Sequence, residues 1–227
     1  MLLYRATKSI LIRMISELIT TLAQARKAAR ITQADLAERA GLSRMAVQRT
    51  ETGDVDPRFS TLQEMARVLN MELIAVPARD FGHDLTAMRA AIRPDTRVVW
   101  LANPNNPTGT FLPYPQLKAF LQRVPQDVVV VLDEAYNEYI PPAERVDTAA
   151  WLADFPNLVL TRTFSKIYGL AGLRIGYALA SADIADLMNR VRQPFNCNNL
   201  ALAAAVAALD DHAFRSEEHT SELQSHS

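Results

Sequence analysis

Hydrophobic residues in the first third of the chain recur every three or four positions, which is the spacing of amphipathic helices. One run predicts a helix that precedes residue 30. A later run predicts a helix from Thr61 to Leu69 that closes a small core. The residues that carry the first pattern are Ile15, Leu18, Ile19, Leu22 and Ala25, and those that carry the second are Leu62, Met65, Ala66 and Leu69.

Between these two runs the sequence carries capping signals for two further helices. Thr32 is a predicted N-cap with Asp35 at the third helical position, and Gly41 offers the left-handed residue that ends a helix. Ser43 then caps a helix that runs from Arg44 to Glu51. Two short helices joined by a tight glycine turn form the helix-turn-helix pattern.

From about residue 77 the pattern changes to short apolar runs that alternate with helical spacing. The apolar runs end at Ala102, Leu132 and Leu160, and polar residues follow each of them. Such alternation predicts a parallel sheet, whose ligands bind at the carboxyl ends of the strands. We therefore expect the three polar clusters to meet at one edge of the sheet. Helices are expected at 84–92, 114–123 and about 149–153.

Charge divides the chain at about the same place. Of the 227 residues, 49% are apolar and 22% are charged, as in ordinary globular proteins. Residues 1–79 hold twelve Lys and Arg against eight Asp and Glu, whereas the remainder holds twelve against seventeen. This asymmetry predicts a nucleic-acid-facing module joined to a neutral-to-acidic one.

Several classes of protein are disfavoured by the same composition. A single cysteine, Cys197, excludes an internal disulfide framework and favours a reducing, cytoplasmic compartment. No apolar run reaches membrane-spanning length, and residues 1–12 lack the features of a secretory signal, so we expect no membrane association. The histidines are too dispersed to form a metal site.

Lys166 follows the third apolar run and is the residue on which the predicted chemistry centres. A partly desolvated lysine amine suits attack on a carbonyl. The hydroxyls of Thr163 and Ser165 and the guanidinium of Arg174 offer donors and counter-charge for a phosphate dianion. A lysine that captures an aldehyde beside a phosphate grip meets the needs of pyridoxal phosphate (PLP).

The other two polar clusters supply the remaining contacts to such a cofactor. Asp133 would stabilise a protonated pyridine nitrogen, and Asn106 and Tyr136 could donate hydrogen bonds to the ring hydroxyl. Lys166, once freed by a substrate amine, would move the proton of the substrate's α-carbon. Each cluster alone could be an ordinary turn or helix start, but their combination favours a cofactor site.

The order Asn-Pro-Thr-Gly, Asp-x-x-Tyr, Ser-Lys and Arg in residues 77–214 resembles the fold-type-I aminotransferases of class I and II. The stretches 104–109, 131–136, 163–174 and 194–199 resemble the histidinol-phosphate aminotransferase subgroup. The resemblance implies PLP as cofactor, a homodimer, and a small-molecule amino donor and 2-oxo acid as substrates. For the subgroup these are histidinol phosphate and 2-oxoglutarate, in histidine biosynthesis.

Residues 14–76 resemble the phage-repressor-like (Cro/C1-type) helix-turn-helix family through 32–37, 40–43 and 51–53. In that family the second helix of the motif enters the major groove of DNA, usually in a dimer. A small helical bundle whose polar face is merely solvated is the alternative. The residues that the resemblance implies at DNA are Gln33, Ser43, Arg44, Met45, Gln48 and Arg49, with Arg44, Met45 and Gln48 nearest the base edges.

The expected fold is therefore an α/β large-domain fragment with a mostly parallel sheet, preceded by a small all-α domain. We expect an extension at 1–13, the two modules at 14–76 and 77–214, and a disordered tail at 215–227. Residues 215–226 resemble a translated sequencing adaptor, which favours an artefactual junction.

Because the family's large domain extends beyond 77–214 at both ends, we expect this chain to fold poorly there and to turn over little substrate. The alternative is a transcriptional regulator whose aminotransferase-like half senses a metabolite.

Overall fold

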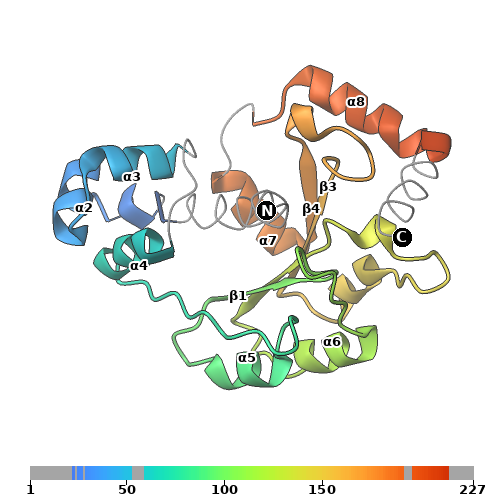
Figure 1. The fold of residues 1–227 in the computed structure, drawn as a ribbon, viewed down its shortest axis with the longest axis horizontal. Helices are drawn as coiled ribbons and strands as arrows, with labels where there is room; N and C mark the ends of the chain where they lie inside the picture. Colours follow the sequence, from blue (N-terminus) through green and yellow to red (C-terminus); the bar gives the residue numbers. More distant parts are fainter. Residues whose placement is uncertain (1–21, 24, 28, 53–58, 192–195, 215–227) are drawn as a thin grey trace. The chain divides into compact units, whose positions relative to one another are not determined.

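The computed structural model describes residues 22–23, 25–27, 29–52, 59–191 and 196–214 (Figure 1). The chain divides into two compact units, Met1–Ala75 and Val76–Ser227. Each unit contains buried hydrophobic clusters of its own. Within the described ranges, no helix combines the length and the apolar composition that crossing a membrane requires.

The first unit contains the predicted helix-turn-helix. Helices α2 (Gln33–Ala40), α3 (Arg44–Glu51) and α4 (Phe59–Val68) follow one another in the chain. Thr32 and Asp35 form a capping box, in which each side chain accepts a hydrogen bond from the backbone N–H of the other. Gly41 ends α2 with a φ of 65°, and the Ser43 side chain caps α3. The capping signals in the sequence are therefore confirmed.

The core of the first unit contains the apolar positions that the helical spacing picks out. Leu22, Leu62, Met65 and Ala66 are buried together, and Leu69 packs against them. Residues 22–23 and 25–27 are helical, in agreement with the first predicted helix. Three positions of that prediction lie outside the described residues, namely Ile15, Leu18 and Ile19.

The second unit is built on a four-stranded sheet in the order β1-β2-β3-β4. Strands β1 (Val98–Ala102), β2 (Val129–Asp133) and β3 (Leu158–Thr163) are parallel, as predicted, and β4 (Gly176–Ala180) runs antiparallel to β3. The register places Ala102 opposite Asp133 and Asp133 opposite Thr161. The carboxyl ends of the three parallel strands therefore lie side by side.

Helices and short 3-10 turns surround this sheet (Figure 1). A large apolar cluster joins the strands to the α6 and η2 regions, with side chains of α5 packed against it. The segment expected to be helical near 149–153 is the 3-10 turn η2. The remaining elements are α5 (Leu85–Ala91), α6 (Tyr114–Leu121), η1 (Asn137–Tyr139), η2 (Thr148–Ala153), η3 (Ala171–Leu173), α7 (Ala182–Val191) and α8 (Asn199–Asp210).

Candidate functional site

Three of the predicted cofactor residues meet at the carboxyl edge of the sheet. The side-chain amide of Asn106 donates a hydrogen bond of 2.5 Å to the hydroxyl of Tyr136. The Nζ atom of Lys166 lies 5.0 Å from the centroid of the Tyr136 ring. These residues come from the loops after β1, β2 and β3, so the sheet topology brings together groups that are 60 positions apart in the chain.

The loop that carries Asn106 is fixed by a second asparagine. Asn103 donates from its side-chain amide to the carbonyl of Leu112 at 3.1 Å and accepts from the N–H of Leu112 at 2.7 Å. Its own backbone N–H donates to the carbonyl of Asp133. The loop after β1 is thereby closed on itself and attached to the end of β2, which holds Asn106 near Tyr136.

Asp133 is the buried last residue of β2, as its position after an apolar run predicts. Its Oδ1 atom accepts a 3.0 Å hydrogen bond from the N–H of Ala135. That bond orients the carboxylate at the start of the turn that leads to Tyr136. The strand end therefore presents an anionic group in a low-dielectric setting, where it interacts strongly with a positive partner.

The three predicted phosphate ligands are only partly brought together. Thr163 ends β3 with 1% of its surface exposed, and its hydroxyl accepts from the N–H of Ser165 at 3.0 Å. Arg174 is exposed, has a φ of 53°, and donates to the carbonyl of Ala171 at 3.0 Å. Thr163 and Ser165 thus form one turn, whereas the described contact of Arg174 is with η3.

A buried polar network that the sequence pattern does not predict lies next to this site. Glu134 forms an ion pair of 2.9 Å with Arg162 and accepts a 2.6 Å hydrogen bond from the hydroxyl of Thr148. Burial opposes the charge on Arg162, but the carboxylate of Glu134 outweighs it and raises the pKa of Arg162. The acidic residue directly after Asp133, within an otherwise apolar stretch, is the available signal for this network.

In the first unit, the exposed face of α3 carries the predicted DNA-contacting residues. Arg44, Met45, Gln48 and Arg49 are all exposed, whereas Val47 on the opposite face is buried in the core. Ser43 is also exposed, and its hydroxyl accepts from the N–H of Ala46 at 3.1 Å. The spacing of the four exposed residues places them on one side of the helix.

Gln33 has a structural partner within its own unit. Its side-chain amide donates to Glu51 at 2.8 Å, and Glu51 also pairs with the guanidinium of Arg26 at 2.6 and 2.9 Å. Burial raises the cost of ionising Glu51, but the hydrogen bonds from Arg26 and Gln33 outweigh it and lower its pKa. This cluster ties the start of α2 to the end of α3.

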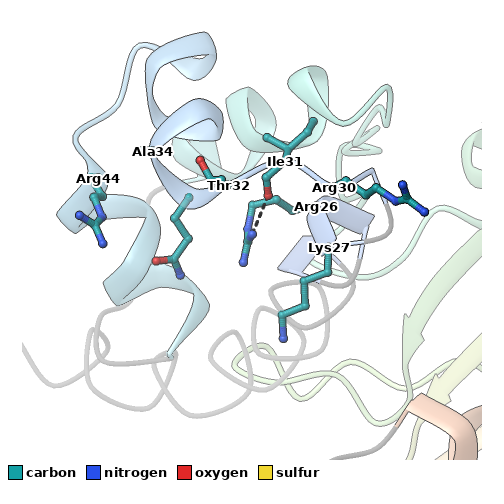
Figure 2. A pocket seen from close by; sticks show the side chains of 8 residues that line it. Arg26, Lys27, Arg30, Ile31, Thr32, Ala34 and Arg44 are labelled. Carbon is teal, nitrogen blue, oxygen red and sulfur yellow. Dashed lines mark hydrogen bonds between the residues drawn. The ribbon is translucent and has the colours of Figure 1, made fainter.

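A basic concavity of about 500 Å³ lies beside that cluster. Figure 2 shows the side chains around it, with a dashed line for the 2.7 Å hydrogen bond from Arg26 to the carbonyl of Ile31. Glu51 neutralises Arg26, so Lys27, Arg30 and Arg44 supply the net positive charge of the lining. Such a surface attracts phosphates.

The fold and the residues at the sheet edge define a class of protein. Residues 55–227 match the model of aminotransferase class I and II, and the chain belongs to that family. Residues 22–75 match a helix-turn-helix model.

The second unit is similar to curated proteins named histidinol-phosphate aminotransferase. Over 143 residues the chain is 80% identical to histidinol-phosphate aminotransferase 1 of Dechloromonas aromatica, which is 63% of this chain and 40% of the relative. It is 71% identical over 141 residues to histidinol-phosphate aminotransferase 1 of Thiobacillus denitrificans, which is 62% of this chain and 37% of the relative.

A solved structure agrees with these relatives. Histidinol-phosphate aminotransferase of Sinorhizobium meliloti, in complex with pyridoxal-5'-phosphate, has a TM-score of 0.63 and 29% sequence identity, covering 93% of this chain and 62% of that one. The chain therefore spans about two fifths of the length of the curated relatives named above.

Proposed function

We propose that the second unit binds PLP at the carboxyl edge of its sheet and attaches it through Lys166. The convergence of Asn106, Tyr136 and Lys166 from three separate loops carries this proposal. The residues fit the group, because the Oδ1 atom of Asn106 is buried and has no hydrogen-bond partner among the described residues. A phenolic hydroxyl of the cofactor would satisfy that acceptor.

Each side chain would have a separate task at this site. Asp133 would keep a proton at the pyridine nitrogen, and Asn106 and Tyr136 would orient the ring hydroxyl. When bound, PLP withdraws electrons from the bond that is broken at the substrate's α-carbon. The amine of Lys166 lies over the Tyr136 ring, beside the proposed position of the cofactor. From there it would remove and return the proton at that carbon.

The proposed phosphate grip consists of Thr163, Ser165 and Arg174. The hydrogen bond from the N–H of Ser165 to the hydroxyl of Thr163 fixes the turn that carries both side chains at the end of β3. Arg174 would supply the positive charge by turning from the carbonyl of Ala171, and its exposure allows that rotation.

We further propose that the substrates are histidinol phosphate and 2-oxoglutarate, because the relatives named above act on the former according to their names. Histidine biosynthesis in the cytoplasm would be the setting. The aligned segment is 40% of the relative's length, so this activity is proposed for the protein to which the segment belongs.

Visible absorption tests the cofactor proposal. After PLP is added and the excess is removed, the chain should keep a visible absorption band that the protein without PLP does not show. Lys166→Ala should lose this band. Tyr136→Phe should keep the band at a shifted position, because the ring hydroxyl loses one donor. A band of equal strength in Lys166→Ala would refute attachment at Lys166.

We propose that the first unit binds duplex DNA through the exposed face of α3. Support comes from four exposed residues on one side of the helix and from the adjacent basic concavity. Arg44→Ala should weaken binding to a selected operator by about 1–3 kcal/mol. Binding that does not fall steeply with salt would contradict the proposal, since phosphate contacts release counterions.

A homodimer is the assembly we propose for the second unit. Helix α8 exposes an apolar stripe formed by Leu202, Val206 and Leu209, which follow one another at helical spacing. Exposed apolar stripes of this kind commonly lie at protein interfaces.

A second candidate function is a regulator in which the cofactor site senses a metabolite. The observation that favours it is the presence of a helix-turn-helix match and an aminotransferase match in one chain. Under that function, PLP or an amine substrate should change the affinity of the full chain for DNA, and Lys166→Ala should remove the effect.

A further inference from the structure

A cavity of about 400 Å³ lies in the second unit beside η1, and none of the proposed cofactor residues lines it. Its walls come from η1, from the loop that precedes η2, and from β3, β4 and the turn after Lys166. The volume falls within the range of cavities that hold small molecules. The cavity is therefore large enough for a ligand as well as for water.

Three buried polar atoms belong to residues that line this cavity and have no hydrogen-bond partner among the described residues. They are Oδ1 of Asn137, Oε2 of Glu138 and Nε of Arg145. Asn137 is 4% exposed and Glu138 is 9% exposed. Buried polar groups are nearly always satisfied in folded proteins, so each of these atoms indicates a partner outside the described residues, either water or a ligand.

The guanidinium of Arg145 is held in a fixed position. Its terminal nitrogen donates to the carbonyls of Glu138 and Ile140 at 2.7 and 2.8 Å. The other arginine of the lining, Arg162, is neutralised by its ion pair with Glu134. The buried part of the lining therefore presents the carboxylate of Glu138 and the guanidinium of Arg145, each with an unsatisfied polar atom. The exposed Asp147 also lines the cavity and accepts from the N–H of Ala149.

We propose that this cavity binds a free α-amino acid in its zwitterionic form. The ammonium group would donate to Glu138 and Asn137, and the carboxylate would accept from Arg145. A simple anion would be repelled by Glu138, and a simple cation would be repelled by Arg145, so a ligand that carries both charges suits the lining best. The rings of Tyr168 and Tyr177 also line the cavity and favour an aromatic side chain.

Calorimetric titration of the full chain with three matched ligands tests this site. L-phenylalanine carries both charges, phenethylamine lacks the carboxylate, and 3-phenylpropionate lacks the ammonium group. Each single-charge analogue should bind about tenfold more weakly than L-phenylalanine, because each loses one charge-assisted hydrogen-bond set. The titrations use Lys166→Ala in the absence of PLP, so that imine formation between a ligand amine and the cofactor does not contribute.

Two variants assign the charges of the ligand to residues of the cavity. Glu138→Gln should reduce the preference for L-phenylalanine over 3-phenylpropionate, and Arg145→Gln should reduce the preference over phenethylamine. The exposed neighbour Glu144 provides the matched control, and Glu144→Gln should change neither preference.

The site would be refuted if L-phenylalanine fails to bind, or if both analogues bind as tightly. It would also be refuted if Glu138→Gln and Arg145→Gln both leave the two preferences unchanged. Because all titrations are made in the absence of Lys166, failure of this site is distinguishable from failure of the proposed PLP attachment.

Discussion

At the scale of single residues, the Arg26–Glu51 pair makes the stability of the first unit depend on pH. The side chains are 10% and 6% exposed, and the pKa of Glu51 is lower in the folded unit than its ordinary value of 4.5. A depressed carboxyl pKa contributes stability that is complete above pH 4.5 and is lost as pH falls through the folded value. The melting temperature of the first unit should therefore decrease when the pH is lowered below 4.5.

Glu51→Gln should reduce this pH dependence, leaving the part that comes from the lowered pKa of Asp35 beside Thr32. It should lower the stability of the first unit by about 3 kcal/mol, because Arg26 loses its partner in a buried setting. Glu64→Gln is the matched control, since Glu64 pairs with Arg67 on the surface and should cost less than about 1 kcal/mol. Chemical denaturation of the two variants at pH 7 and pH 4 measures the difference. Equal losses in the two variants would contradict the structural role of the pair.

His83 should make the stability of the second unit depend on pH. Its Nε2 atom accepts from the N–H of Ala102 at 3.1 Å, and burial lowers the pKa of the imidazole from 6.5. The unfolded chain therefore takes up a proton at higher pH than the folded chain, so stability should decline as pH falls below 6.5. Thermal melts between pH 7.5 and 5.5 should show this slope, and His83→Gln, whose side-chain oxygen can still accept, should flatten it. An unchanged slope would exclude His83 as the cause.

At the scale of elements, the capping box of α2 is a specific source of stability. Thr32→Ala removes the acceptor for the N–H of Asp35 and should cost the first unit about 1 kcal/mol. Gln63→Ala on the exposed face of α4 is the control and should change stability little. Urea denaturation followed by circular dichroism measures both, and equal midpoints for the two variants would contradict the importance of the cap.

Elements with a strong local signal could be predicted from the sequence. Helix α2 has the Thr32–Asp35 capping box and Gly41, and α3 has the Ser43 N-cap. Strands β1, β2 and β3 are continuous apolar runs bounded by polar turns. Helix α8 could not be predicted in this way, because its small and apolar residues surround the whole helix without a polar face. Strand β4 has five residues, as β1 and β2 do, but it is only partly buried and lacks the β-branched run that marks those two strands.

The same distinction applies to the candidate cofactor site. Asn106, Asp133, Tyr136 and Lys166 each follow a predicted strand, so the topology alone places them at one edge. The Glu134–Arg162 ion pair joins the end of β2 to β3. It forms only when the two strands are paired, so no local sequence pattern predicts it. The partner of Gln33 likewise depends on a tertiary contact, whereas the described contact of Arg174 is a local one with Ala171.

At the scale of the whole molecule, the apolar stripe on α8 predicts self-association of the chain. Val206 is 66% exposed at the centre of the stripe, between Leu202 and Leu209. Val206→Glu should shift the chain towards the monomer in sedimentation velocity, because a buried charge opposes association. Ala207→Glu, on another exposed side of the same helix, is the control and should leave the distribution unchanged. The stripe would not be an interface if both variants sediment like the original chain.

The attachment of PLP to Lys166 is the central claim, and peptide mapping tests it most directly. The full chain would be incubated with PLP, reduced with borohydride to make the attachment permanent, digested and examined by mass spectrometry. The chain has only four lysines, Lys8, Lys27, Lys118 and Lys166, so every possible position can be compared. We predict that the label is concentrated on Lys166 and that Lys118→Ala leaves this unchanged. A label spread evenly over the four lysines would contradict a cofactor site in this chain.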